Sequence, residues 1–293
     1  MPSRHTNPVA AAAAVPSTTG AVARRGNRSG EDGGRIVVRL LDGFDLSCDG
    51  ESVSVPLASQ RLVAFLALQN RPLLRVYVAG SLWLDANEER SCASLRSALW
   101  RLPRPGHPVV EATVTHVGLG QTVVVDVHEL VRTARRVLDG THGVAQERID
   151  ERELDGDLLP DWYEDWLEPE RERLRQLRLH AIEAAAERAL AQGRPAHAVD
   201  LALGALRREP LRESLHAIAI RGHLAQGNRH DAIRQHRGHA ERMATNLGLT
   251  PSPDIVRLLE EADVLPTGEA NGSAALPTPT EPSPPGPSRA SRS

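Results

Sequence analysis

Three short runs with the pattern of β-strands begin the patterned part of the chain. Arg35–Leu41 is mostly apolar, and apolar and polar residues alternate over Phe44–Cys48 and Ser52–Val55. Between the last two, Asp49-Gly50 is a dipeptide typical of tight hairpin turns. Because an apolar residue at every second position marks a strand with one buried face, the pattern predicts a small antiparallel sheet.

The apolar period then changes to that of helices. The first helix is expected from Leu57, with Ser59 as its N-cap, to the Asn70-Arg71-Pro72 sequence, where proline cannot continue it. The second should cover Tyr77–Leu84, and the Asp85-Ala86-Asn87 sequence ends it. Inward-facing apolar residues on these two helices are expected at Leu62, Phe65, Leu66, Leu68, Val78, Leu82 and Trp83.

A third helix is predicted over Glu88–Leu102, capped by Asn87 and stopped by Pro103. Its buried stripe is expected at Cys92, Leu95, Leu99 and Leu102. Two further β-runs, Val109–Val117 and Leu119–Val127, enclose Gly118 and predict a hairpin. Strands, three helices and a hairpin in this order are typical of a winged helix-turn-helix unit.

The third helix carries a second stripe, which is the strongest candidate binding site. It consists of Arg90, Ser94, Ser97 and Arg101. Arginine can bind guanine with two hydrogen bonds, and serine can reach base edges or phosphates, so we expect this stripe to face a DNA major groove. A solvated helix face is the alternative, but no acidic residue lies on the stripe after Glu89.

Further DNA contacts are expected around this helix. Arg96, which with Trp100 flanks the stripe, and Arg104 are candidates for phosphates or RNA polymerase, and the hairpin is expected to lie near the minor groove through Thr113, Thr115 and His116. An ordinary edge hairpin is the alternative for the last three residues.

The second half of the chain has a helical pattern. Pro169 starts a helix with apolar positions at Leu174, Leu177, Ala181 and Ala185. The sequence Leu-Ala-Gln-Gly at 190–193 recurs at 224–227, an offset of 34 residues, and Ala198 matches Ala232. That offset is the tetratricopeptide period. The aromatic group Trp162, Tyr163 and Trp166 is expected to anchor the core between two domains rather than to cage a ligand.

Composition defines the limits of these domains in the 293-residue chain. Residues 1–34 and 264–293 are rich in Pro, Ser and Gly without periodicity and predict disordered tails. The fold class expected between them is mixed and mainly α, with a winged-helix domain at 35–126 and an all-α tetratricopeptide-like domain at 127–263. All 35 basic residues are arginine, and the net charge is −3. The segment from Arg35 to Val110 contains nine arginines and seven acidic residues. This excess is small, so DNA affinity must come from the placement of the charges.

Several function classes lack support in the sequence. No phosphate-binding glycine loop, serine elbow or metalloprotease motif is present, so we expect no enzyme and no cofactor. The spacings of the 12 histidines and of Cys48 and Cys92 fit no zinc site, and the two thiols are expected to be reduced. No apolar run is long enough to cross a membrane, and we expect neither a signal peptide nor a membrane partner but a cytoplasmic protein.

Three sequence strings resemble the short-form AfsR/SARP regulators, the Streptomyces antibiotic regulatory proteins. The winged-helix start of that family is similar to RLLDGFDLSCDGESVSVPLASQRLVAFLAL, and its second and third helices are similar to VAGSLWLDANEERSCASLRSALWRL. The bacterial transcriptional activator domain of that family is similar to the segment that begins with VVVDVHEL. This segment continues through GDLLPDWYEDWLEPERERLRQLRLHAIEA, EPLRESLHAIAIRGHLAQGNRHDAI and LGLTPSPDI. The resemblance covers residues 36–262.

The resemblance implies an OmpR-type winged helix joined to a tetratricopeptide-like domain. It also implies a sequence-specific transcriptional activator that binds double-stranded DNA as a pair of subunits at promoter direct repeats and recruits RNA polymerase. The competing hypothesis is a protein-interaction adaptor that uses its helical repeats and does not bind DNA.

Overall fold

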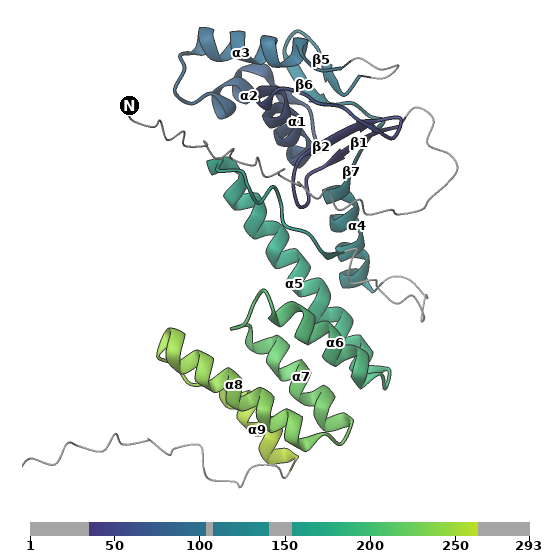
Figure 1. Cartoon of the computed structure of the whole chain (residues 1–293), viewed down its shortest axis with the longest axis vertical. Coiled ribbons are helices and arrows are strands. Elements are labelled where there is room, and N and C mark those ends of the chain that lie inside the picture. Colours follow the sequence, from purple (N-terminus) through teal and green to yellow (C-terminus); the bar gives the residue numbers. More distant parts are fainter. Residues whose placement is uncertain (1–34, 104–107, 141–153, 263–293) are drawn as a thin grey trace, which may run out of the picture. The chain divides into compact units, whose positions relative to one another are not determined.

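The computed structural model describes residues 35–103, 108–140 and 154–262, in which two small sheets precede a series of antiparallel helices (Figure 1). The tails expected at 1–34 and 264–293 lie outside the described residues. No helix in the described part of the chain is both long and apolar enough to cross a membrane. The fold is mixed and mainly α, as the sequence predicts.

The first sheet has four strands in the order β3-β2-β1-β7. They are β1 (Ile36–Arg39), β2 (Asp45–Cys48), β3 (Glu51–Ser52) and β7 (Val123–Val125). β1 pairs antiparallel with β2 and parallel with β7, with Ile36 opposite Cys48 and Val123. The predicted turn between β2 and β3 is confirmed, since Asp49 and Gly50 have φ values of 54° and 82°, which a primed hairpin turn requires. The third strand is shorter than predicted.

The second sheet has the order β4-β6-β5 and lies next to three helices. Its strands are β4 (Leu73–Leu74), β5 (Val110–Ala112) and β6 (His116–Leu119), and the helices are α1 (Leu57–Gln69), α2 (Arg75–Leu82) and α3 (Glu88–Trp100). The predicted hairpin is present, but the predicted position of its turn, at Gly118, is wrong. Gly118 lies inside β6 opposite Glu111, and the chain reverses at 113–115. The strand that follows, β7, pairs with β1 in the other sheet because its valines complete that sheet's buried face.

Two helix boundaries also differ from the prediction. Ser59 is not the N-cap of α1, because the carbonyl of Pro56 already accepts the first helical bonds and the Ser59 side chain is buried. α2 begins at Arg75, two residues before the predicted Tyr77, directly after β4, a strand that the sequence pattern did not reveal. The end of α1 is as predicted, since Asn70 adopts the left-handed conformation there.

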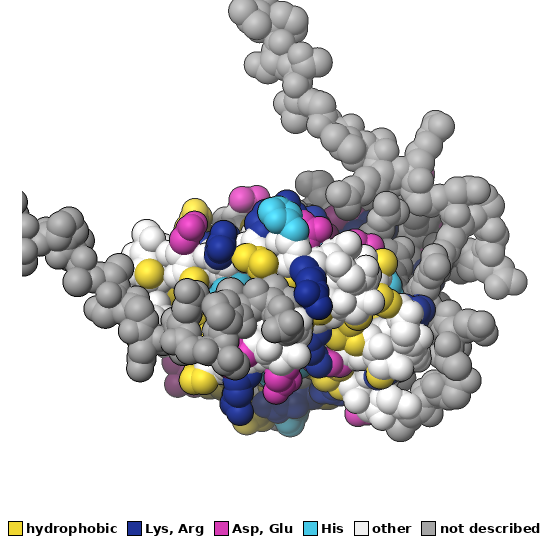
Figure 2. All heavy atoms as spheres, turned by 90° about the horizontal axis from the view of Figure 1, so that it is seen from below, with side chains coloured by type: hydrophobic (Ala, Val, Ile, Leu, Met, Phe, Trp, Pro, Cys, Tyr) yellow, Lys and Arg dark blue, Asp and Glu magenta, His cyan; other side chains and the backbone are white. Residues whose placement is uncertain are grey.

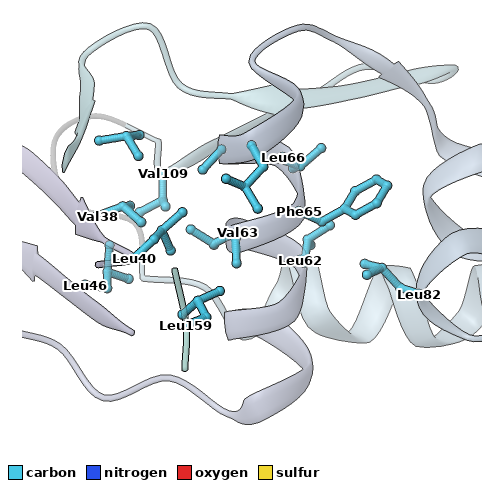
Figure 3. Packing of buried hydrophobic residues seen from close by; sticks show 14 of the residues in the cluster. Val38, Leu40, Leu46, Leu62, Val63, Phe65, Leu66, Leu82, Val109 and Leu159 are labelled. Atoms are coloured by element: carbon cyan, nitrogen blue, oxygen red, sulfur yellow. The ribbon is translucent and has the colours of Figure 1, made fainter. Parts of the chain in front are cut away.

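One hydrophobic core fills the space between the first sheet and α1 (Figure 3). Val38 and Leu46 from the strands, together with Leu40 directly after β1, point toward Leu62 and Leu66 of α1. Since aromatic residues are only 3% of the chain, branched aliphatic side chains provide most of this packing. The same core includes Leu159 and Leu167, which precede the helical half.

The helical half is built from helix pairs. The helices are α4 (Asp126–Asp139), α5 (Glu168–Ala191), α6 (Pro195–Leu206), α7 (Glu213–Ala225), α8 (Arg229–Leu247) and α9 (Pro253–Glu261), and a 3-10 turn (Asp165–Leu167) precedes α5. The 34-residue echo is confirmed as a structural repeat. Gly193 and Gly227, both with positive φ, follow the ends of α5 and α7, and Ala198 and Ala232 are fully buried on α6 and α8. The domain is therefore tetratricopeptide-like.

Candidate nucleic-acid interface

The position of α3 is fixed at its first turn. The Asn87 side chain accepts a hydrogen bond from the backbone N–H of Arg90 at 3.0 Å, which is the predicted N-cap. Glu88 and Glu89 lie in the first turn, where carboxylates favour the helix dipole. The cap therefore determines which residues of α3 face outward, and Arg90 is the first of the predicted stripe to do so.

The inner face of α3 uses smaller residues than the sequence predicts. Ser91, Leu95 and Ala98 are buried, whereas Cys92 and Leu99 are only half-buried. The Ser59 hydroxyl of α1 donates to the Ala98 carbonyl at 2.9 Å. Because small side chains lie at this contact, α1 approaches the backbone of α3 closely enough for that bond. The helix ends at Trp100, two residues before the prediction.

The predicted stripe is largely accessible. Arg90, Ser97 and Arg101 are exposed and Ser94 is half-buried, and Arg101 is the C-cap residue rather than part of the helix. Within the described residues, the guanidinium groups of Arg90 and Arg101 form no ion pair or hydrogen bond. Their charges are therefore available to an external anion.

The outermost side of α3 is a second accessible surface. Arg96 is exposed, with no ion-pair partner among the described residues, and Trp100 is 76% exposed. At 100° per residue, Trp100 projects from the side of the helix opposite Ser91 and Ala98. An aromatic ring that remains exposed on a helix of this kind can pack on a sugar or a thymine methyl group, a possibility that its sequence position alone does not indicate. Arg104 lies outside the described residues.

The tip of the β5–β6 hairpin contains the other predicted contacts. Thr113, Thr115 and His116 are all exposed, and Val114 between them is 93% exposed. The Thr113 hydroxyl accepts from the His116 backbone N–H at 3.0 Å, and the Thr115 hydroxyl lies 2.9 Å from the His116 ring. The structure thus brings these three side chains together in one small turn, which we call the wing tip (113–116).

Arg75 joins the wing tip to α2, a role that no pattern in the sequence indicates. Its backbone N–H donates to the Thr115 carbonyl at 2.9 Å, and its guanidinium donates to the Thr113 carbonyl at 3.0 Å. A short strand ending directly before a helix could have indicated such a link, but a two-residue strand such as β4 has no recognisable period.

Glycine at position 120 holds the base of the hairpin. A Cβ atom there would lie 2.1 Å from the Pro108 carbonyl oxygen, and the Gly120 N–H donates to the Val109 carbonyl at 2.9 Å. Only a residue without a side chain allows the two strands to meet at this distance.

Other regions provide weaker candidate sites. In the described residues no three His, Cys, Asp or Glu side chains converge to hold a metal ion. Cys48 and Cys92 form no disulfide. On the face shown in Figure 2, arginine side chains lie among acidic and apolar ones. That face therefore presents no continuous basic surface.

The comparisons with known proteins agree with this architecture. Residues 125–262 match the family described as bacterial transcriptional activator domain. A solved structure, Mycobacterium tuberculosis EmbR in complex with a low affinity phosphopeptide, has the same fold, with a TM-score of 0.63 and 22% sequence identity. The match covers 78% of this chain and 65% of the EmbR chain. No curated protein matches the chain significantly.

The chain therefore combines a winged-helix unit with a segment, residues 125–262, that matches the bacterial transcriptional activator domain. The domain match and the shared fold agree with the resemblance of the sequence strings to regulators of the AfsR/SARP type.

Proposed function

We propose that this protein is a sequence-specific DNA-binding transcriptional activator. The observation that carries the proposal is a pair of exposed arginines, Arg90 in the first turn of α3 and Arg101 at its C-cap, which have no carboxylate partner among the described residues. Unneutralised arginines on the third helix of a winged-helix unit are suited to guanine and phosphate contacts. We assign DNA binding to residues 35–126 and activation to residues 127–263.

In this proposal each part of the interface has its own role. The Arg90, Ser94, Ser97 and Arg101 stripe contacts base edges in the major groove, while the wing tip residues Thr113, Thr115 and His116 contact the adjacent minor groove. Arg96 and Arg104 contact phosphates or RNA polymerase. Because the overall net charge is −3, affinity depends on these local positive charges.

The resemblance to the AfsR/SARP regulators supports the activator role. We propose that two subunits bind promoter direct repeats in the cytoplasm and that the helical domain helps to recruit RNA polymerase. One winged helix gives a small interface, and a second subunit raises the effective affinity without any new kind of contact.

The proposal is tested by titrating the full chain against DNA fragments from its own genomic neighbourhood, at several salt concentrations and with excess random competitor. Competitor-resistant binding that weakens steeply with salt is expected, because each phosphate contact releases counterions. A folded protein without such binding at low salt would contradict the proposal and favour the adaptor hypothesis, in which the helical repeats are the functional surface.

A further inference from the structure

Apart from the hydrogen bonds within its own turn, the wing tip is bonded to the rest of the described residues mainly through β4 and Arg75. The ladder between β4 and β6 stops at the pair formed by Leu74 and His116, because β4 has only two residues. Beyond that pair the tip residues are exposed and bury no apolar side chain. Exposed segments with few packing contacts open easily, so a hydrogen bond from outside the turn contributes a large share of its order.

Arg75 provides two such bonds from one residue. Its backbone N–H extends the ladder by one step to the Thr115 carbonyl, and its guanidinium reaches the Thr113 carbonyl on the other side of the turn. Arg75 is also the first residue of α2, whose buried residues Val78 and Leu82 share a core with Leu95 of α3. A chain of direct contacts therefore runs from the wing tip through α2 to α3.

We propose that Arg75 is a positioning residue that sets the distance between the wing tip and α3, and so fixes which minor-groove position is contacted when α3 occupies the major groove. This inference rests on the DNA-binding function proposed above. An arginine suits the role because its long side chain spans the turn while its guanidinium donates to a carbonyl, which methionine of similar length cannot do.

The test compares Arg75→Met with Arg135→Met in the full chain. Arg135 is an exposed arginine of α4 whose side chain has no hydrogen-bond or ion-pair partner among the described residues, so its replacement removes the same charge away from the wing. In the free protein, Arg75→Met should accelerate amide hydrogen exchange at Thr113 and His116, whose N–H groups are hydrogen-bonded within the tip, and Arg135→Met should leave it unchanged. Equal exchange in both variants would overturn the inference without involving DNA.

Footprinting of the protein on its operator distinguishes contacts in the major groove from contacts in the minor groove. Arg75→Met should lose protection at the flank covered by the wing and keep protection in the major groove, with binding weakened roughly three- to tenfold. The conservative variant Arg75→Lys retains a donor and should restore part of the wing protection. Equal loss at both flanks would mean that Arg75 supports the whole unit and would contradict a positioning role.

A double-mutant cycle shows whether Arg75 affects DNA binding through the wing tip or through α3. Arg75→Met should add little to His116→Ala, because both act at the wing tip, but should be additive with Arg101→Ala. The opposite pattern would contradict the inference. A third outcome is that the wild-type chain protects no DNA while Arg75→Met still accelerates amide exchange at the wing tip. In that case the proposed DNA-binding function fails, and only the structural role of Arg75 in ordering the wing tip is supported.

Discussion

Ser59 illustrates how a single residue can have a different role from the one that its sequence position suggests. A serine at the start of an apolar period is typical of an N-cap, yet its hydroxyl lies inside the molecule and donates to the Ala98 carbonyl. A prediction from local sequence could not identify this bond, because its acceptor is 39 residues away. Arg90, in contrast, is exposed as predicted, because helix phase determines that property, and Arg101 at the C-cap is exposed as well.

Gly120 leads to a prediction at the same scale. Gly120→Ala places a Cβ atom 2.1 Å from the Pro108 carbonyl oxygen, so the strands must separate. We expect the free energy of unfolding to fall by about 1–3 kcal/mol, the usual range for overpacking. Urea denaturation of the full chain measures the change.

The matched control is Gly80→Ala. Gly80 lies inside α2, and a Cβ atom there would have no neighbour within 4 Å. Alanine should therefore stabilise the helix by about 0.5–1 kcal/mol. If Gly120→Ala were as harmless as Gly80→Ala, the close approach of Gly120 to Pro108 would be disproved.

Among the elements, α7 and α8 share a histidine contact whose stability we expect to depend on pH. His216 and His239 are both fully buried, with ring centroids 4.0 Å apart. Burial lowers the pKa of His216 to about 4, although the Pro210 carbonyl partly offsets it, and burial also lowers the pKa of His239 against the effect of Glu213. The other nearby charged group, Arg242, opposes protonation of both rings.

These directions predict acid sensitivity of the helical half. In the unfolded chain His216 has a pKa of about 6.5, so below that pH it binds a proton that it does not bind in the folded protein. The stabilising effect is therefore complete at neutral pH and is lost as the pH falls toward about 4. The loss should reach at most about 1.4 kcal/mol per pH unit for one histidine. Urea unfolding between pH 7.5 and 5 checks this, and His216→Gln should have a shallower slope. Parallel slopes would contradict the assignment.

The elements also show what patterning can and cannot predict. Helix periods and the 34-residue echo predicted α1, α3, α5 and the repeat, because amphipathic spacing and glycine termination are local properties. The turn of the wing was misplaced at Gly118, since a glycine in a β-run can mark either a turn or a close approach. Here the approach is to Pro72, whose Cα atom would lie 3.3 Å from a Cβ atom at that position.

At the scale of the molecule, the segment before α5 packs against the winged-helix unit. The Leu159 N–H donates to the Leu40 carbonyl at 2.9 Å, and Trp162 stacks on Phe44 with ring centroids 5.9 Å apart. Trp166 contacts Phe65 edge to face, which confirms the predicted anchoring for these two tryptophans. Tyr163, predicted with them, is 97% exposed, because it occupies the one position of the three that faces away from the core.

Glu164 tests how strongly this segment is held. Its carboxylate accepts from the Arg61 guanidinium of α1 at 2.7 Å and from the Trp166 ring N–H at 3.0 Å, and both charged side chains are less than a quarter exposed. Glu164→Gln should lower the free energy of unfolding by about 1–3 kcal/mol, since the hydrogen bonds to a charged group weaken. Calorimetry or urea denaturation measures it.

A second carboxylate provides the control for that prediction. Glu170 pairs with Arg173 within α5, three residues apart, at 2.8 Å. Helix pairs of this spacing contribute about 0.2–0.5 kcal/mol, so Glu170→Gln should change stability far less. Similar losses in the two variants would show that the Arg61–Glu164 contact does not hold the segment in place.

The central claim is that α3 contacts specific bases, and Arg101→Ala tests it most directly. Binding of the wild-type chain and of the variant is measured on the operator and on a random duplex of the same length, with Arg135→Ala as the control for lost charge. We predict that Arg101→Ala weakens operator binding by about 1–3 kcal/mol and relaxes the base preference at one position, while random binding changes little. Operator binding unchanged by Arg101→Ala would contradict the proposed placement of α3.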